Sequence, residues 1–356
     1  MKSEKKIIEQ KGNKYGIHRV ISPQGVLPQA ASKVNNDMNL YYDNEIRVRV
    51  EALNIDSASF TQIAASCNQE NEKIKNEIYN IVCEKGKMQN RVTGSGGMFI
   101  GTISYIGSAI KNCELQIGDK IASLVSLSLT PLKIEKILSI NEALDRVYME
   151  GEAILFESGI YVKLPADINE ELSLAAMDVA GAPAQTAHIV QPQDSCLILG
   201  GAGKAGILCC YEAKKRAGSN GNITAVVYNE EEYRLLDAFQ ICDHIVIGDA
   251  SKPAFLLDKI LAANNNQEYD LSICCVNVMN CEMSAILPVR DNGTVYLFSM
   301  ATSFTSCALG AEGIGKDITM IIGNGYTKGH AEFTLNELRE APQLLEFYKQ
   351  KYILQV

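Results

Sequence analysis

The chain has 356 residues, of which 47 % are hydrophobic and 21 % charged, values typical of globular proteins. Single hydrophobic cores usually stop growing at about 250 residues, so we expect more than one domain. A net charge of −9 argues against a nucleic-acid partner, which would call for a basic surface. No apolar run reaches the about 18 residues of a transmembrane helix, so we expect no membrane partner either.

The first half of the chain is predicted to be rich in β structure. Asn44–Leu53 has the alternating apolar residues of a half-buried strand. Helical spacing over Glu70–Glu84 predicts a helix, and Asn169–Val190 is predicted to form one long helix with a kink at Pro183. Further strands are expected over 13–60, 99–110, 118–125 and 153–164.

A short apolar run, Cys196–Leu199, is followed by glycines at 201, 203 and 206, and then by an apolar, helix-like segment up to Arg216. From there the pattern alternates between strands and helices, which is typical of a doubly wound parallel sheet. The expected strands are 223–227, 244–247, 271–275, 294–298 and 318–322, and the expected helices lie near 230–239, 254–263, 281–288 and 334–351. The predicted fold class is therefore α/β, with a Rossmann domain over residues 190–320.

The glycine pattern G-x-G-x-x-G between a strand and a helix favours a dinucleotide site over a purely structural turn. The residues expected to line the pyrophosphate are Gly201, Ala202, Gly203, Lys204 and Ala205. Asn229 or Glu230 is expected at the ribose hydroxyls, and Asp249 beside the adenine. The residues expected on the nicotinamide side follow two later strands and are Asn277, Val278, Ser299 and Met300.

The order of a β-rich region followed by a Rossmann region resembles the medium-chain dehydrogenase/reductase superfamily. Val48–Asp56, Gly94–Thr102, Gly118–Ile121 and Ala175–Gly181 carry the resemblance. It implies a GroES-like catalytic domain over residues 1–189, to which residues 321–356 return. It also places Asp56, Ser95 and Val179 where related enzymes hold zinc; valine is no ligand and serine is a poor one, so we expect no metal.

At a finer level, the chain resembles the L-erythro-3,5-diaminohexanoate dehydrogenase family. The segments that carry this resemblance are 86–90, 93–98, 124–132, 155–161, 178–185, 298–305 and 323–332. It implies oxidative deamination of that diamino acid at C3 to 5-amino-3-oxohexanoate and ammonium, a step of lysine fermentation. The implied partners are the small diamino acid and a second copy of the chain, as a dimer or tetramer.

The implied reaction needs a base for the C3 ammonium, and base catalysis contributes about 10² to 10⁴ in rate. Asp56 is the first candidate, with a helix-capping aspartate as the alternative. Asp178 lies in an apolar helical run, where a carboxylate is unusual unless it is paired. The alternative to a catalytic role for Asp178 is a structural, buried ion pair. Glu157 is the third candidate, or else part of a solvated strand. Ser57 and Ser95 are candidates to supply hydroxyl groups, with a structural turn as the alternative.

The remaining expectations concern charge and compartment. Lys87 or Lys328 is a candidate for holding the substrate carboxylate, although a surface lysine is the simpler interpretation, and His330 is either a proton shuttle or structural. Consecutive glutamates at 230–232 favour NAD, while Arg234 leaves NADP open. The absence of C-x-x-C among eleven cysteines indicates a reducing cytoplasm. The competing functions are a zinc-free quinone or enoyl reductase and a non-catalytic dinucleotide-binding protein.

Overall fold

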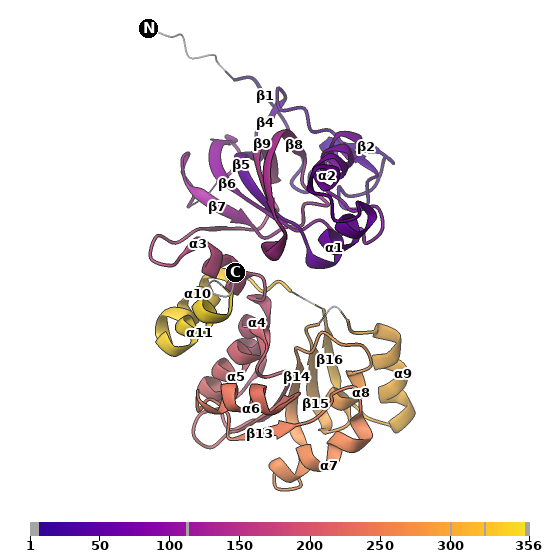
Figure 1. The fold of residues 1–356 in the computed structure, drawn as a ribbon, viewed down its shortest axis with the longest axis vertical. Helices are drawn as coiled ribbons and strands as arrows, with labels where there is room; N and C mark the ends of the chain where they lie inside the picture. The colour runs from indigo at the N-terminus through magenta and orange to yellow at the C-terminus, as the bar shows by residue number, and fades with distance from the viewer. Residues whose placement is uncertain (1–6, 112–113, 300, 324, 353–356) are drawn as a thin grey trace. The chain divides into compact units, whose positions relative to one another are not determined.

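The computed structural model describes residues 7–111, 114–299, 301–323 and 325–352. By its internal contacts the chain divides into two compact units, Met1–Ala166 and Asp167–Val356 (Figure 1). This division groups residues 167–189 and 321–356 with the parallel sheet. The domain boundaries taken from the sequence stay a prediction. No described helix is both long enough and apolar enough to cross a bilayer.

The first unit is built on a six-stranded antiparallel sheet with the order β10-β7-β6-β5-β9-β8. Its strands are β5 (Glu45–Asn54), β6 (Met98–Ile106), β7 (Lys120–Ser123), β8 (Leu132–Asn141), β9 (Arg146–Phe156) and β10 (Tyr161–Lys163). The alternation predicted along β5 is confirmed, because Ile46, Val48 and Val50 are all buried in one hydrophobic core. Sequence patterning missed β8, whose residues 135–141 are not buried.

Two helices pack into the core of this unit, α1 (Ser57–Ser66) and α2 (Asn71–Lys85). The predicted helix over 70–84 is confirmed as α2, which buries Ile74, Ile78 and Ile81. The β structure expected up to residue 60 was wrong at its end, because α1 begins at Ser57. Short strands complete the unit: β1 (Glu9–Gln10) pairs with β4 (Tyr41–Tyr42), and β2 (Val20–Ser22) pairs with β3 (Lys33–Val34).

The second unit contains a six-stranded parallel sheet with the order β13-β12-β11-β14-β15-β16. Its strands are β11 (Ser195–Leu199), β12 (Asn222–Val227), β13 (His244–Ile247), β14 (Tyr269–Cys274), β15 (Val289–Leu297) and β16 (Thr319–Ile322). The helices between them are α5 (Lys204–Ala217), α6 (Glu230–Asp237), α7 (Pro253–Ala263), α8 (Glu282–Ile286) and α9 (Phe304–Ile314). The chain leaves β11 towards β12 on one side and resumes at β14 on the other. This strand order is that of a Rossmann sheet, which confirms the predicted fold class.

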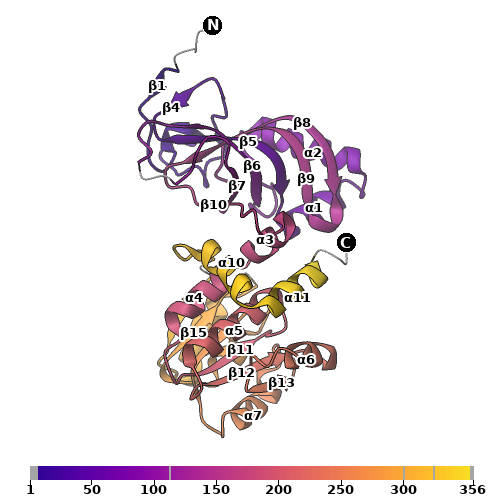
Figure 2. The same cartoon turned by 90° about the vertical axis from the view of Figure 1, so that its left-hand side faces the viewer.

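The helices outside the β–α alternation differ from the sequence prediction. The segment expected as one helix is two, α3 (Glu170–Met177) and α4 (Gly181–Ile189). The break falls at residues 178–180, and Pro183 lies in the first turn of α4, where its missing N–H costs nothing. The tail is likewise split into α10 (His330–Glu340) and α11 (Pro342–Tyr352), with Pro342 at the start of the latter. Figure 2 shows α10 and α11 beside α4 and α5.

Candidate functional site

The turn between β11 and α5 is tightly packed backbone. Gly200 has a φ of 80°, which a residue with a side chain rarely adopts. A Cβ on Gly206 would lie 2.0 Å from the Gly200 carbonyl oxygen, and one on Gly201 would lie 2.7 Å from the Cβ of Ala225. At Gly203, by contrast, a Cβ would meet only that same oxygen, at 3.2 Å. Gly203 is therefore the glycine whose missing side chain leaves open space above the turn.

Helix α5 starts at this turn with Gly203 as its N-cap, a residue that has no side chain to cap the first N–H groups. Backbone N–H groups at a helix N-terminus, together with the helix dipole, suit an anion such as a pyrophosphate. Ala202 and Ala205 are buried and add no bulk beside them. The residues predicted to line the pyrophosphate therefore fit a dinucleotide phosphate group.

Asp178 lies beside this turn. Its carboxylate accepts a hydrogen bond from Lys204 Nζ at 2.9 Å, and its side chain is 59 % exposed. The expectation of a buried carboxylate in an apolar helix was wrong, because α3 ends at Met177 and Asp178 is its solvent-facing C-cap. An ion pair this exposed contributes about 1 kcal/mol or less. Its effect here is to orient the Lys204 ammonium at the phosphate turn.

The C-terminal helix also reaches the glycine turn. Tyr348, from α11, donates a hydrogen bond from its hydroxyl to the Lys204 carbonyl oxygen at 2.6 Å. Lys351, one turn later, places its Nζ 3.5 Å from the carbonyl oxygen of Ala202. Sequence reasoning missed both residues, since they are about 145 positions away from the turn along the chain. The aromatic and basic residues of the tail were the available signal.

The end of β12 has the acidic character predicted for it. Asn229 caps α6, its side chain accepting from the Glu232 N–H at 2.9 Å. Glu232 in turn accepts from the N–H of Tyr228 at 2.7 Å. Glu230 is exposed at the start of α6. The carboxylates at 230 and 232 thus follow the strand directly, where they suit ribose hydroxyl groups better than a phosphate.

The predicted residues after the next strands lie at the same sheet edge, because parallel strands share their carboxyl end. Asp249, after β13, is held in a turn by Ser251, whose N–H and hydroxyl both donate to its Oδ1; these bonds hold the pKa of Asp249 below its usual range. Asn277, after β14, accepts a hydrogen bond from the hydroxyl of Ser299, after β15, at 3.3 Å. Val278 is 55 % exposed beside them. Met300 lies outside the described residues.

In the first unit, Asp56 immediately precedes α1. Its side chain is exposed and caps no N–H of that helix, so the alternative of a helix-capping aspartate finds no hydrogen bond to support it. The Asp56 carboxylate makes no hydrogen bond or ion pair with any described residue, whereas the next residue, Ser57, donates to Asp145. The carboxylate is therefore available to a ligand.

A cluster of hydroxyl groups lies in the same unit. The fully buried Ser59, from α1, has its Oγ 2.6 Å from Thr93 Oγ1 and 2.6 Å from Ser95 Oγ. Asn90 braces the loop, because its side chain accepts from the N–H groups of Val92 and Thr93 and donates to the Ser59 carbonyl. Ser95 is thus part of a connected network. Ser59 was missed, since a serine inside a helix gives no signal of its tertiary partners.

The other candidate residues make no hydrogen bond to this hydroxyl cluster within the described part of the chain. Glu157, just after β9, is exposed and bonds to no described residue. Lys87 is fully buried, so the surface interpretation was wrong: its Nζ donates to the carbonyls of Pro28 and Gln29, and burial lowers its pKa to about 8. Lys328 is exposed. His330 is buried, its pKa lowered by burial, and packs edge-on against Tyr326.

Neither unit offers an evident metal centre within the described ranges. No group of three or more His, Cys, Asp or Glu side chains is placed there to hold an ion. Val179 lies in the turn between α3 and α4, and Ser95 bonds to other hydroxyls. The prediction of a metal-free protein stays a prediction for elemental analysis.

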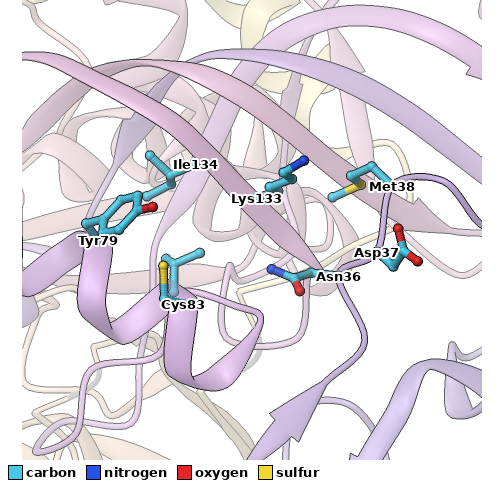
Figure 3. A pocket seen from close by; sticks show the side chains of 8 residues that line it. Asn36, Asp37, Met38, Tyr79, Cys83, Lys133 and Ile134 are labelled. Carbon is cyan, nitrogen blue, oxygen red and sulfur yellow. The ribbon is translucent and has the colours of Figure 1, made fainter.

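The first unit also has a pocket of about 350 Å³ (Figure 3). Figure 3 shows side chains from α2, from β8 and from the segment before β4 around it. The lining residues are Asn36, Asp37, Met38, Tyr79, Val82, Cys83, Lys133 and Ile134. None of them is among the residues predicted for catalysis or for the cofactor, and the pocket is distinct from the hydroxyl cluster.

Comparison with known proteins shows which family the chain belongs to. Residues 18–165 match the N-terminal domain model of L-erythro-3,5-diaminohexanoate dehydrogenase. A protein of that name from Acetoanaerobium sticklandii is 59 % identical over 344 residues, 96 % of this chain and 100 % of its own. The chain belongs to the L-erythro-3,5-diaminohexanoate dehydrogenase family. A second dehydrogenase of that name, from Fusobacterium nucleatum, is 57 % identical over 97 % of this chain and 100 % of its own.

Solved structures similar to this diaminohexanoate dehydrogenase family member show its fold. CurK enoyl reductase has a TM-score of 0.52 at 14 % identity and covers 85 % of this chain and 80 % of its own. A crotonyl-CoA carboxylase/reductase solved with NADP has a TM-score of 0.55 at 12 % identity, with 84 % and 78 % covered. The chain therefore shares the fold of these reductases, with a parallel Rossmann sheet and a β-rich unit, as the sequence predicted.

Proposed function

We propose that this chain catalyses the NAD-linked oxidative deamination of L-erythro-3,5-diaminohexanoate to 5-amino-3-oxohexanoate and ammonium, as in lysine fermentation. The observation that carries the proposal is the 59 % identity to a dehydrogenase of that name over its full length. In balance, the C3–H leaves as hydride to the dinucleotide, and water supplies the oxygen of the new ketone. Ammonium and one proton are released.

The residues of the glycine turn fit the cofactor in this proposal. Gly201, Ala202, Gly203 and Ala205 would hold the pyrophosphate through backbone N–H groups, and Lys204 would add its charge. Asn277 and Ser299, joined by their hydrogen bond, would face the nicotinamide side. The dinucleotide, when bound, supplies the hydride acceptor, and all other chemistry falls to the side chains.

Asp56 is our candidate for the base that removes a proton from the C3 ammonium. It is an exposed carboxylate with no partner among the described residues, which leaves it free to accept a substrate proton. Thr93 and Ser95 would orient the amine and the attacking water, and the buried Ser59 would position both hydroxyls. Glu157 is kept as a candidate counter-charge for the C5 ammonium, and Lys328 as one for the carboxylate.

NAD is the preferred dinucleotide in this proposal. Glu230 and Glu232 follow β12 directly, and their carboxylates would repel a 2′-phosphate at the adenosine ribose. We expect kcat/KM to be at least about 10-fold higher with NAD+ than with NADP+, an energy difference of about 1.4 kcal/mol. A clear preference for NADP+ would contradict this and would direct attention to Lys204, Arg234 and Lys351.

The proposal is tested by following NAD+ reduction with synthetic 3,5-diaminohexanoate, with lysine and simple enones with NADH as comparisons. We expect turnover with the diamino acid alone, with ammonium released in a 1:1 ratio to reduced dinucleotide. Turnover of enones or quinones instead would favour a zinc-free reductase. Tight dinucleotide binding without turnover of any of these compounds would favour a non-catalytic binding protein.

Two further expectations, on cellular location and on subunit number, belong to this proposal. A cytoplasmic location and a homodimer or homotetramer are expected from the family resemblance alone. Gel filtration with light scattering measures the number of subunits, and fractionation of cells measures the location.

A further inference from the structure

Two thiols meet beneath the glycine turn. Cys209, in the second turn of α5, has its Sγ 3.9 Å from the Sγ of Cys275, the residue that follows β14. Cys209 is fully buried and Cys275 is partly exposed. A disulfide has a sulfur–sulfur distance of about 2.05 Å. The two sulfurs are therefore neighbours that need to approach by about 2 Å to form a bond.

A second contact makes this pair distinguishable from its surroundings. Cys210, the next residue of α5, bonds through its thiol to Cys242, which lies in the loop before β13. Adjacent residues of one helix therefore face thiols from two different loops of the parallel sheet. The exposed Cys83, in the other unit, has Tyr79 rather than a cysteine as its partner.

We propose that Cys209 and Cys275 are an oxidant-responsive dithiol, which a small hydroperoxide converts to a disulfide. The two thiols lose two protons and two electrons, the sulfur–sulfur bond forms, and the peroxide O–O bond breaks to give an alcohol and water, or two waters from hydrogen peroxide. The reaction starts at Cys275, the less buried of the two residues, and Cys209 then displaces its hydroxyl group.

The bond would act on the dinucleotide turn, and this part of the inference rests on the proposed function. Cys275 donates its N–H to the Leu199 carbonyl at the end of β11, and Cys209 lies three residues after Gly206. Pulling the two sulfurs together shifts α5 against the strand ends. The turn between them is closely packed and cannot absorb such a shift, since Gly206 already lies against the Gly200 carbonyl. The shift therefore distorts the pyrophosphate site.

The environment sets the expected rate. The contact with Cys209, and then burial, raise the pKa of the Cys275 thiol well above its ordinary value, so the reactive thiolate is scarce. The reaction is therefore slower than oxidation of Cys83. Because the site is largely enclosed, small peroxides reach it and protein disulfide reductases do not. Small thiols such as dithiothreitol are the expected reductants.

The test is to treat the native full-length protein with hydrogen peroxide, block the remaining thiols at low pH and digest it with trypsin. Cleavage gives peptides 205–214 with Cys209 and Cys210, 235–259 with Cys242, and 260–290 with Cys275. We expect 205–214 linked to 260–290. No such link in folded protein, or a link only to 235–259, would overturn the proposal.

Cys275→Ser is the matched variant, and its melting temperature is measured first to show that it folds. The 205–214 to 260–290 link must disappear in it; persistence through Cys274 or Cys281 would overturn the assignment to Cys275.

In the unaltered protein, oxidation is expected to weaken NAD+ binding at least about 10-fold. This loss is expected to be reversed by dithiothreitol and to be absent in the Cys275→Ser variant. Linked protein with unchanged affinity would overturn the coupling to the turn. If the reduced protein binds no NAD+, the proposed function is contradicted. The proposal of an oxidant-responsive dithiol is then judged only by whether the 205–214 to 260–290 disulfide forms.

Discussion

At the scale of single residues, position on the surface matters more than residue type for the catalytic assignment. By sequence, Asp56 ranks ahead of Asp178 and Glu157 as the candidate base, although all three are carboxylates. In the structure Asp178 is paired with Lys204 at the phosphate turn, while Asp56 and Glu157 are exposed and bond to no described residue. Only Asp56 also precedes the helix that carries Ser59 of the hydroxyl cluster. This makes Asp56 the first choice for the base.

Asp56→Asn keeps the shape of the side chain and removes its charge and basicity. We expect kcat for the diamino acid to fall by about 10² or more, the range for loss of a general base. NAD+ affinity and the melting temperature are expected to stay unchanged, because the Asp56 side chain caps no N–H of α1, and its backbone carbonyl, which accepts from Phe60, is kept in the variant. The checks are steady-state kinetics, calorimetry with NAD+, and thermal unfolding.

The matched control is Glu157→Gln, an equally exposed carboxylate. If Asp56→Asn turns over substrate normally while Glu157→Gln is inactive, the roles of the two are exchanged. If Asp56→Asn unfolds or fails to bind NAD+, the residue is structural and the proposed base role is wrong.

Glu337, in α10, is a buried carboxyl group whose two oxygens accept no hydrogen bond from any described residue. Burial, and then the nearby Glu212 of α5, raise its pKa well above the ordinary value; Cys209 and Glu340 act in the same direction and Lys215 opposes them. A carboxyl whose pKa is raised by folding binds its proton more tightly in the folded state. The free energy of unfolding therefore falls as pH rises from the ordinary carboxyl pKa towards the raised one.

Glu337→Gln removes the titrating group, so that this position no longer contributes to the pH dependence of the free energy of unfolding. We expect the variant to be more stable than the parent at pH 8, by about 1 kcal/mol or more, with little difference at pH 4. Urea unfolding at both pH values measures it. Glu340→Gln is the control on the same helix, because Glu340 is half exposed and paired with Lys215. Equal pH dependence in parent and Glu337→Gln would contradict the raised pKa.

At the scale of elements, the strand–turn–helix unit of β11 and α5 separates structural glycines from a binding glycine. A Cβ at residue 206 would collide with backbone, whereas one at residue 203 would meet only the Gly200 carbonyl oxygen, at 3.2 Å. Gly203 has a φ of −76°, which any residue adopts, so a side chain there causes no backbone strain. Side chains introduced at residues 203 and 206 are therefore expected to have different effects, on ligand binding at 203 and on packing at 206.

We expect Gly203→Val to lower the melting temperature less than Gly206→Ala does, since its Cβ meets one backbone atom at 3.2 Å rather than three below 3.0 Å. The same variant is expected to weaken NAD+ binding at least about 10-fold, since the side chain fills the phosphate site. Gly206→Ala is expected to lower the melting temperature by several degrees, because an overpacked site costs about 1–3 kcal/mol. Thermal unfolding and calorimetry distinguish the two. Normal NAD+ binding by folded Gly203→Val would place the phosphate elsewhere.

At the scale of the whole molecule, the family resemblance carries an expectation about metal. The resemblance to the medium-chain dehydrogenase/reductase superfamily implies that Asp56, Ser95 and Val179 occupy the positions where its zinc-containing members hold the metal. We expect purified protein to contain less than about 0.1 zinc per chain and to keep its activity after dialysis against a chelator, since a zinc site needs three strong ligands. One zinc per chain, with activity lost on its removal, would contradict the expectation.

The sequence by itself determined the features that depend on local pattern. The alternation in β5, the apolar stripe of α2, and the strand, glycine turn and helix around residues 195–217 each follow from the spacing of a few neighbouring side chains. The alternating strands and helices after them fixed the parallel sheet. The family followed from long matching segments rather than from any single motif.

Only the tertiary structure decided which distant residues meet. Asp178 looked buried because its neighbours are apolar, but α3 ends there and turns it to solvent; Lys87 looked like a surface residue, but it is buried on two carbonyls of a segment almost 60 residues earlier. The same holds for Ser59 and for Cys209 with Cys275. Side-chain burial and partnership depend on how elements pack, and spacing along the chain carries no record of contacts made across it.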